Sequence, residues 1–311
     1  MSAQDVALFV AFTVLPSLLV AFVAAFLVRR LAPRYGLVDR PNNRKVHQNT
    51  TPLGGGLAIW FGVVLPFAIG QLALLLLQQE SLAERIPIPD LVRPHLEGIR
   101  SQTGSLWLML AAGTILMIVG LLDDLRELNW RLRLLIQFGV AAACVFFFGW
   151  KATAFIGIPI LTGLLSVFWI VALINSFNML DNMDGLSGGV ATIAAGGLAI
   201  LMLLSKDPET RQPQLFVAGL LLVIVGALLG FLFHNRPPAR IFMGDAGSYF
   251  VGFCIALATL LATYAGYRSE GKHSVLAPML VMAVPFYDML SVLWIRWREG
   301  RSLSLIHISE P

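Results

Sequence analysis

Long apolar runs separated by short polar stretches form the pattern of this chain from end to end. Nine runs of about 20 residues can be marked, at roughly 5–28, 54–77, 105–122, 134–150, 156–174, 187–204, 214–233, 248–266 and 276–295. A run of about 20 apolar residues crosses the hydrocarbon core of a bilayer as an α-helix. Because a spanning segment must satisfy its own backbone, and these runs do not alternate as barrel strands do, we expect helices throughout. The pattern predicts an all-α polytopic membrane helix bundle with about nine transmembrane helices.

Composition supports a membrane domain. Hydrophobic residues make up 57% of the chain and charged residues 13%, whereas soluble domains carry about 25% charged residues. We therefore expect a single integral membrane domain over residues 1–302. The first run follows no basic segment and ends in Arg29-Arg30, which favours a transmembrane helix over a signal peptide. Cys144 and Cys254 both lie inside apolar runs, which favours small core residues over a disulfide or metal site.

The distribution of positive charge predicts the orientation of the chain. The net charge is only +4, and no basic stripe with interleaved aromatic residues is present, so a nucleic-acid partner is not expected. With the N-terminus outside, fourteen of the 22 lysines and arginines lie on the inner side and eight on the outer side. Because short cytoplasmic loops are enriched in Lys and Arg, we expect the N-terminus outside and the C-terminus in the cytoplasm. This orientation places the polar clusters described next on the cytoplasmic face.

The first cluster is an acidic pair, Asp123-Asp124, at the end of an apolar run. Two neighbouring carboxylates raise each other's pKa unless a cation shares them. Arg126, Arg131 and Arg133 follow closely and could supply that cation. The alternative is a solvated helix end with local salt bridges, so the pair by itself only suggests a site.

The second cluster is the stretch NSFNMLDNMDGLSGG, residues 175–189, which contains no Lys or Arg. Its polar members include Asn175, Asn178, Asp181, Asn182 and Asp184. Ionisable groups near membrane depth are costly and usually functional. On a straight α-helix Asn178 and Asp181 are neighbours, whereas Asn175 and Asp184 point in opposite directions. Either the stretch tightens toward 3₁₀ geometry, or only part of it faces a site; the alternative to a site is a polar loop with turn residues.

A third cluster places Asp245 between Gly244 and Gly247 at the start of an apolar run. A helix that begins here would direct free N–H groups and the positive end of its dipole at an anion. The alternative is that Asp245 serves as an N-cap in a glycine-rich turn.

A fourth, basic cluster precedes the second apolar run and contains Arg44, Lys45 and His47, followed by the glycines 54–56. These side chains could clamp a phosphate, or they could anchor the loop to anionic lipid. The glycines do not form a Walker A loop, because no Gly-Lys-Ser/Thr follows. Asp288, inside the last run, is interpreted as a structural acid.

Together the clusters indicate phosphoryl transfer at a membrane surface. Mg²⁺ takes hard oxygen ligands, usually one or two carboxylates plus substrate phosphates, and arginines bind phosphates. A soluble substrate reaches this face from the cytoplasm and a lipid substrate reaches it from the bilayer. An ion-coupled transporter would place its acids near the midplane, and an intramembrane aspartyl protease could use Asp184 and Asp245. Mg²⁺ dependence and release of a nucleotide separate the transferase from both alternatives.

These stretches resemble a known family, the polyprenyl-phosphate N-acetylhexosamine-1-phosphate transferases of the WecA type, in glycosyltransferase family 4 and related to the MraY translocases. The matching segments are DRPNNRKVHQNTTPLGGG, GLLDDLRELNWRLR, NSFNMLDNMDGLSGG and ARIFMGDAGS, in the family's order. The resemblance covers nearly the whole chain. It implies transfer of a sugar 1-phosphate from a UDP-N-acetylhexosamine to undecaprenyl phosphate, giving undecaprenyl-diphospho-sugar and UMP. It also implies Mg²⁺, with Mn²⁺ as an alternative, the bacterial inner membrane, an active site on the cytoplasmic face, initiation of a cell-envelope glycan, and a homodimer.

The resemblance also implies roles for individual residues. The catalytic residues would be Asp123 and Asp124, as the acidic pair beside the reacting phosphates, and Asp181 and Asp184, as polar residues lining the nucleotide-sugar site. Asp123 is a candidate general base toward the lipid phosphate. The metal ligands would be Asn178 and Asp245. Arg133 would bind the diphosphate, and the other substrate-binding residues would be Arg44, Lys45, His47, Asn175 and Asn182.

The chain departs from the family pattern at two places. Asn182 stands where many relatives have glycine, which is a mild change. Relatives continue past Ser302 into a basic loop with a His-x-His-His cluster, whereas here residues 303–311 are atypical and His307 is out of register. We interpret this segment as a truncated or artefactual tail. The basic loop resembles the N-acetylhexosamine branch more than the muramyl-peptide branch, which favours UDP-GlcNAc as the donor.

Overall fold

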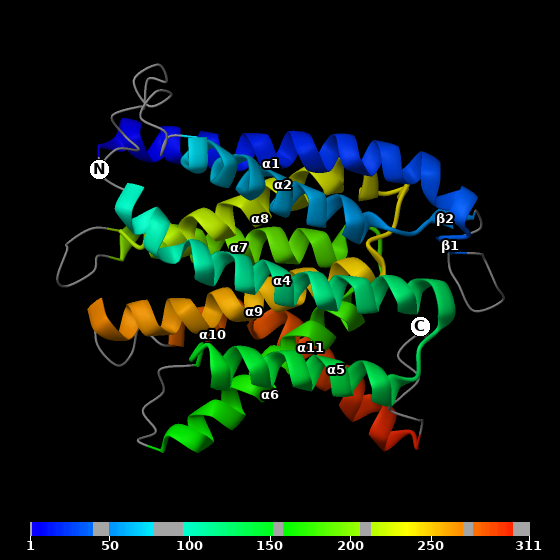
Figure 1. The fold of residues 1–311 in the computed structure, drawn as a ribbon. Helices are drawn as coiled ribbons and strands as arrows, with labels where there is room; N and C mark the ends of the chain where they lie inside the picture. Colours follow the sequence, from blue (N-terminus) through cyan, green and yellow to red (C-terminus); the bar gives the residue numbers. More distant parts are fainter. Residues whose placement is uncertain are drawn as a thin grey trace.

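The structure is a computed structural model that describes residues 2–39, 50–76, 96–151, 158–205, 213–269 and 276–300. Long helices dominate it (Figure 1). The helices are α1 (Ala3–Leu31), α2 (Gly55–Leu76), α4 (Leu96–Arg126), α5 (Trp130–Ala142), α6 (Pro159–Leu180), α7 (Leu186–Leu204), α8 (Leu215–Asn235), α9 (Gly244–Ser269), α10 (Leu276–Val281) and α11 (Ala283–Arg298). A 3₁₀ turn at Ala32–Tyr35 continues α1, and a π-helical turn at Ala143–Phe147 continues α5. Two short strands, β1 (Val38–Asp39) and β2 (Thr51–Pro52), pair antiparallel.

The prediction of an all-α polytopic bundle is confirmed. Within the described ranges, eight helices are long and apolar enough to cross a membrane. The ninth apolar segment forms two shorter helices, α10 and α11, instead of one continuous span. The tail 303–311 lies outside the described residues.

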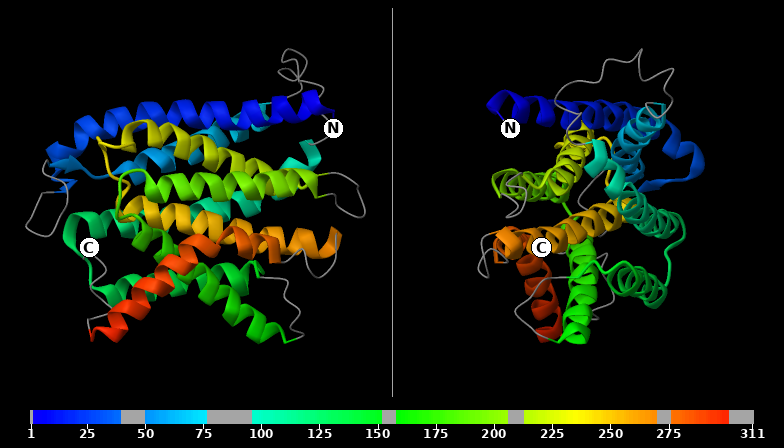
Figure 2. Two further views of the ribbon diagram at one scale, coloured as in Figure 1. Left: turned by 180° about the vertical axis from the view of Figure 1, so that it is seen from behind. Right: turned by 60° about the vertical axis from the view of Figure 1, so that its left-hand side comes forward.

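The interruption between α10 and α11 has a local cause. In a continuous helix the ring of Pro285 would clash with the carbonyl of Val281, and Pro285 has no N–H to donate to it. The chain instead breaks at Met282, which has φ −88° and ψ 4° and precedes the first turn of α11. Proline is tolerated in a first turn, where the backbone N–H groups have no helical acceptor. The restarted helix crosses α6 (Figure 2), where the Ser176 hydroxyl contacts the Met289 sulfur at 3.3 Å.

The centre of the bundle is α9. In the most apolar 18-residue stretch of α9, 94% of the residues are buried, whereas 11% are buried in the corresponding stretch of α1. α1 therefore lies at the periphery, on the opposite side of the bundle from α5 and α6 (Figure 1). α1 is tied to α8 through Gly226 and Gly230, where an added Cβ would meet the carbonyl oxygens of Val14 and Leu18 at 2.4 and 2.3 Å. Small residues four apart allow membrane helices to approach this closely.

The described residues of the three acidic and amide clusters lie at one end of the bundle, the end at which β1 and β2 lie (Figure 1). The C-termini of α4 and α6 and the N-termini of α5 and α9 contribute side chains that contact one another there. Three parts of the chain that are far apart in the sequence, at 123–133, at 178 and at 245, therefore form one polar region. The predicted orientation of this end toward the cytoplasm stays a prediction.

Candidate active site

The N-terminus of α9 is positioned by backbone contacts that only glycine permits. A Cβ on Gly120 of α4 would lie 2.4 Å from the carbonyl carbon and oxygen of Asp245. A Cβ on Gly56 of α2 would lie 2.2 Å from the backbone nitrogen of Gly247. In addition, the N–H groups of Gly55 and Gly56 donate to the carbonyl oxygens of residues 242 and 243, each at 2.9 Å. These contacts fix Asp245 against α2 and α4.

Asp124 caps α9 from a different helix. Its carboxylate accepts hydrogen bonds from the backbone N–H groups of Asp245 at 2.9 Å and Ala246 at 3.2 Å. Gly244 precedes them with φ +71°, and a Cβ there would lie 2.6 Å from the Asp124 carboxylate. The helix N-terminus thus does face an anion, as its sequence suggested. That anion is Asp124, and the Asp245 carboxylate is left to make other contacts.

The Asp245 carboxylate contacts Asn178 at the end of α6. The Asn178 Nδ2 group donates to Asp245 Oδ1 at 2.6 Å and to Ser248 Oγ at 3.0 Å. Both residues are buried, with 8% and 6% of their surface exposed. Among the described residues, Asn178 Oδ1 has no hydrogen-bond partner. The pair therefore presents a buried amide oxygen beside a buried carboxylate.

Arg133 is the cation that pairs with the acidic motif. Its guanidinium forms an ion pair with Asp123, and its Nη1 lies 3.4 Å from Asp245 Oδ2 and 3.4 Å from the Tyr249 hydroxyl. Asp123 also accepts hydrogen bonds from the Leu128 N–H at 2.7 Å and from the Tyr249 hydroxyl at 3.3 Å. Of the three arginines that follow the acidic pair, Arg133 is thus the one seen to bridge Asp123 and Asp245.

Helix α6 remains α-helical through Leu180, and this separates the polar residues of its C-terminal stretch. Asn178 faces Asp245, whereas Asn175 donates from Nδ2 to Gln137 Oε1 of α5 at 2.7 Å. Of the two geometries that the sequence left open, the structure has the one in which only part of the stretch faces the site. The predicted substrate contact of Asn175 stays a prediction.

Beyond α6, the turn 181–185 leads into α7 and carries the remaining acids. Asp181 follows the last turn of α6. Burial raises the pKa of Asp181 to about 7; the Asp124 and Asp184 carboxylates contribute in the same direction, and a hydrogen bond from the Gly244 N–H opposes them. A carboxylate in this setting is costly to ionise unless a cation binds near it.

Asp184 and Asn182 lie farther along the same turn. Asp184 accepts a hydrogen bond from the Ala239 N–H at 2.8 Å, so it holds the segment that leads into Gly244. Asn182 is exposed on the surface. The structure therefore brings Asp123, Asp124, Arg133, Asn178 and Asp245 together, while these two residues occupy other positions.

Three of the sequence-predicted residues, Arg44, Lys45 and His47, lie outside the described residues. The ends of their loop are nonetheless described. β1 and β2 pair Val38 with Pro52 and Asp39 with Thr51, and the Phe242 N–H donates to the Pro52 carbonyl at 2.9 Å. The loop therefore leaves and re-enters the fold beside the segment that carries Asp245.

Comparison with known proteins identifies the family. The model of glycosyl transferase family 4 matches residues 106–263, a range that includes every residue of the gathered polar set. The chain belongs to glycosyl transferase family 4.

Family 4 relatives share most of the length of this chain. It is 34% identical over 281 residues to the probable undecaprenyl-phosphate N-acetylglucosaminyl 1-phosphate transferase of Bacillus subtilis, covering 88% of this chain and 67% of the relative. It is 33% identical over 313 residues to the decaprenyl-phosphate N-acetylglucosaminephosphotransferase of Mycobacterium tuberculosis, covering 93% and 71%. It is 29% identical over 293 residues to the undecaprenyl-phosphate alpha-N-acetylglucosaminyl 1-phosphate transferase of Escherichia coli K12, covering 89% and 68%. The predicted resemblance is confirmed.

The family 4 site offers oxygen ligands suited to a hard cation. No group of three or more His, Cys, Asp or Glu side chains that could hold a metal occurs within the described ranges. Mg²⁺ does not require such a group, because it usually binds one or two carboxylates and completes its shell with water and substrate phosphates. The Asp245 carboxylate and the partnerless Asn178 Oδ1 fit that chemistry.

Two residues of the site were not among the sequence-predicted residues. Tyr249 contacts Arg133 and Asp123, and Ser248 contacts Asn178, both from the first turns of α9. Their spacing held a usable signal. Ser248 is three residues from Asp245 and Tyr249 is four, so each shares a helix face with a candidate residue.

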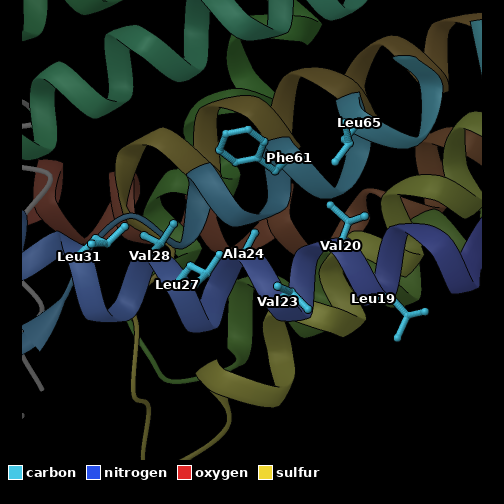
Figure 3. A pocket seen from close by; sticks show the side chains of 9 residues that line it. All are labelled: Leu19, Val20, Val23, Ala24, Leu27, Val28, Leu31, Phe61 and Leu65. Atoms are coloured by element: carbon cyan, nitrogen blue, oxygen red, sulfur yellow. The ribbon is translucent and has the colours of Figure 1, made fainter. Parts of the chain in front are cut away.

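An apolar groove lies between α1 and α2 (Figure 3), and none of the polar set lines it. It has a volume of about 550 Å³. Its lining consists of the apolar residues Leu19, Val20, Val23, Ala24, Leu27, Val28, Leu31, Phe61 and Leu65. The groove suits hydrocarbon and not phosphate, so it is no candidate for the site of phosphoryl transfer.

Proposed function

We propose that this protein transfers N-acetylglucosamine 1-phosphate from a UDP-sugar to a polyprenyl phosphate, and that this acceptor is undecaprenyl phosphate. The relatives from Bacillus subtilis and Escherichia coli are named for transfer to undecaprenyl phosphate, and the relative from Mycobacterium tuberculosis for transfer to decaprenyl phosphate. The observation that carries the proposal is the Asn178–Asp245 pair beside the Arg133–Asp123 ion pair at one end of the bundle. It combines oxygen ligands for a cation with a fixed guanidinium for phosphates.

In the proposed reaction, an oxygen of the lipid phosphate forms a bond to the phosphorus that carries the sugar. The bond between that phosphorus and the oxygen that joins the two phosphates of the UDP-sugar breaks. UMP leaves with the electron pair of this bond. The products are polyprenyl-diphospho-N-acetylglucosamine and UMP. The main barrier is the approach of one anion to another, so charge neutralisation and positioning are the dominant needs.

We assign the cation to Asp245 and Asn178. Mg²⁺, when bound there, would neutralise phosphate charge and hold the diphosphate of the donor. The Asn178 amide is oriented by its two donations, to Asp245 and to Ser248, and its Oδ1 has no hydrogen-bond partner among the described residues. Asp124 contributes indirectly, since its capping of α9 holds the Asp245 backbone in place.

Asp123 acts by holding Arg133 and not as a general base. Its carboxylate already accepts hydrogen bonds from Arg133, from the Leu128 N–H and from the Tyr249 hydroxyl. A phosphate monoester has a second pKa near 6, so most of the acceptor is dianionic at pH 7 and removal of a proton gains little. The guanidinium held by Asp123 is suited to bind a phosphate in a fixed orientation.

The remaining assignments complete the proposal. Arg44, Lys45, His47 and Asn182 would contact the UDP-sugar or the acceptor phosphate, and Asp181 and Asp184 would shape the nucleotide-sugar side of the site. The protein would lie in the bacterial inner membrane with this site on the cytoplasmic face, where it would initiate a cell-envelope glycan. A homodimer is the proposed assembly, and size analysis in detergent tests it.

The test is UMP release by the purified protein in detergent with polyprenyl phosphate and a panel of UDP-sugars. We expect release with UDP-GlcNAc, formation of an equal amount of the diphospho-lipid, and no release without Mg²⁺. Release without the lipid acceptor would indicate a hydrolase. Transfer from another UDP-sugar in preference to UDP-GlcNAc would contradict the donor assignment alone.

A further inference from the structure

A buried amide beside the site has a hydrogen-bond donor with no partner. The buried side of α5 consists of Arg133, Gln137 and Ala141, spaced one turn apart. Gln137 has 0% of its surface exposed. Its Oε1 accepts a hydrogen bond from Asn175 Nδ2 at 2.7 Å, but its Nε2 has no partner in the part of the chain that the structure describes. Buried polar groups are nearly always paired, so a donor in this position requires an explanation.

The orientation of the Gln137 amide follows from its neighbours. Asn175 Nδ2 donates both to Gln137 Oε1 and to the Val171 carbonyl oxygen, the latter at 2.8 Å. If the Asn175 amide group were rotated by 180°, its Oδ1 would lie against the carbonyl oxygen of Val171, and two acceptors would face each other. The Nδ2 group must therefore face that carbonyl. Gln137 must then present its oxygen to Asn175. The partnerless atom of Gln137 is therefore its NH₂ group, and the missing partner is an acceptor.

The position of Gln137 indicates which acceptor it meets. It lies one helical turn from Arg133, deeper along α5, and its partner Asn175 lies three residues before Asn178 on α6. The opposite side of α5 is apolar and exposed, with Leu135 70% exposed. Gln137 thus lies on the buried side of α5, in contact with α6 and one helical turn from Arg133, and the exposed apolar residues of α5 lie on the other side of the helix.

We propose that Gln137 donates a hydrogen bond from Nε2 to a phosphate oxygen of the polyprenyl phosphate acceptor and forms, with Arg133, the acceptor-phosphate subsite. This inference rests on the proposed transferase function. A lipid phosphate enters from the bilayer and carries the oxygen acceptors that the amide lacks. Hydrogen bonds to charged groups are stronger than neutral ones, so the contact selects for the phosphate.

The experiment compares the kinetics of Gln137→Met and Gln137→Glu with those of the wild type. Methionine has a volume similar to that of glutamine and removes both the N–H donors and the amide oxygen. Glutamate removes the N–H donors but keeps an oxygen that can accept the hydrogen bond from Asn175. We expect the KM for polyprenyl phosphate to rise about tenfold or more in both variants, because a hydrogen bond to a charged group is lost. The KM for UDP-GlcNAc and kcat should change less than twofold. Gln71→Met, the same substitution in α2, is the matched control and should leave all three constants unchanged.

The outcomes separate the two proposals. Absence of turnover in the wild type would overturn the proposed function and the subsite with it. Turnover with an unchanged acceptor KM in both variants would overturn the subsite alone and indicate that a water satisfies Nε2. A joint change of kcat and both KM values, with a lowered unfolding midpoint, would indicate that Gln137 only ties α5 to α6 and would equally overturn the subsite.

Discussion

Substitution of Gly120 by alanine should uncouple the catalytic end of α9 from α4. An alanine Cβ would lie 2.4 Å from the carbonyl carbon and oxygen of Asp245, whereas ordinary contact begins at 3.4 Å. The two helices must therefore separate by about 1.0 Å at this point, the difference between these distances. A displacement of about 1 Å in a reacting constellation can lower turnover by about a hundredfold. Overpacking of a buried contact costs about 1–3 kcal/mol of stability.

Helix α4 supplies its own control series. At Gly104 an added Cβ meets nothing within 4 Å, and at Gly113 it would lie 3.0 Å from the Phe250 ring, a side chain that can turn aside. Gly104→Ala should leave turnover unchanged and gain up to about 1 kcal/mol of helix stability. Gly113→Ala should be intermediate. The order of the three positions tests whether proximity to Asp245, and not the substitution itself, sets the effect.

The assay is the initial rate of UMP release in detergent at saturating substrates, together with the thermal unfolding midpoint of each variant. We expect Gly120→Ala to lose about a hundredfold in rate, and to have a lowered midpoint. A folded Gly120→Ala variant whose rate stays within about threefold of Gly104→Ala would refute the reasoning. The contact between α4 and α9 would then not position Asp245.

Further predictions concern the polar set. Asp245→Asn should reduce turnover by about a hundredfold or more, because it removes a charged cation ligand. This loss of turnover should exceed the loss caused by Asp123→Asn. The reverse order in measured turnover would favour Asp123 as a general base. Arg133→Lys should lose about tenfold or more in kcat/KM, because an ammonium cannot bridge Asp123, Asp245 and Tyr249 as the guanidinium does; rates near the wild type would contradict this role. Chelation by EDTA should abolish UMP release and added Mg²⁺ should restore it, while Asn178→Ala should shift the Mg²⁺ titration to higher concentration; identical titrations would remove Asn178 from the cation site.

The helical architecture was predictable because the bilayer leaves the backbone few choices. Runs of about 20 apolar residues must form helices to satisfy their own N–H and C=O groups, and α1, α2 and α8 follow the predicted segments closely. The division of the last segment into α10 and α11 was missed, although Pro285 carried the signal. Helix α6 extends to Leu180, beyond the end of the apolar run marked at about residue 174, and it therefore carries Asn175 and Asn178.

The sequence predicted which residues could form a site, but it did not predict which of them contact one another. The sequence indicated Asp124 as one member of an acidic pair and Asp245 as an acid between two glycines, but it did not indicate that Asp124 caps the helix that carries Asp245. Three arginines followed the acidic pair, and the sequence contained no means of choosing Arg133. Gln137 drew no attention, because a single amide in an apolar run looks like an ordinary helix residue until its burial and its missing partner are seen.

The sequence by itself determined the membrane class, the helical elements and the set of polar residues from which a site could be built, because these depend on local composition and on the periodicity of the helix. The tertiary structure decided which of those residues meet. Side-chain contacts between α4, α5, α6 and α9 depend on where glycines such as Gly56 and Gly120 let backbones touch. Spacing along one helix fixes which residues share a face, but the approach between helices is set by packing over the whole bundle.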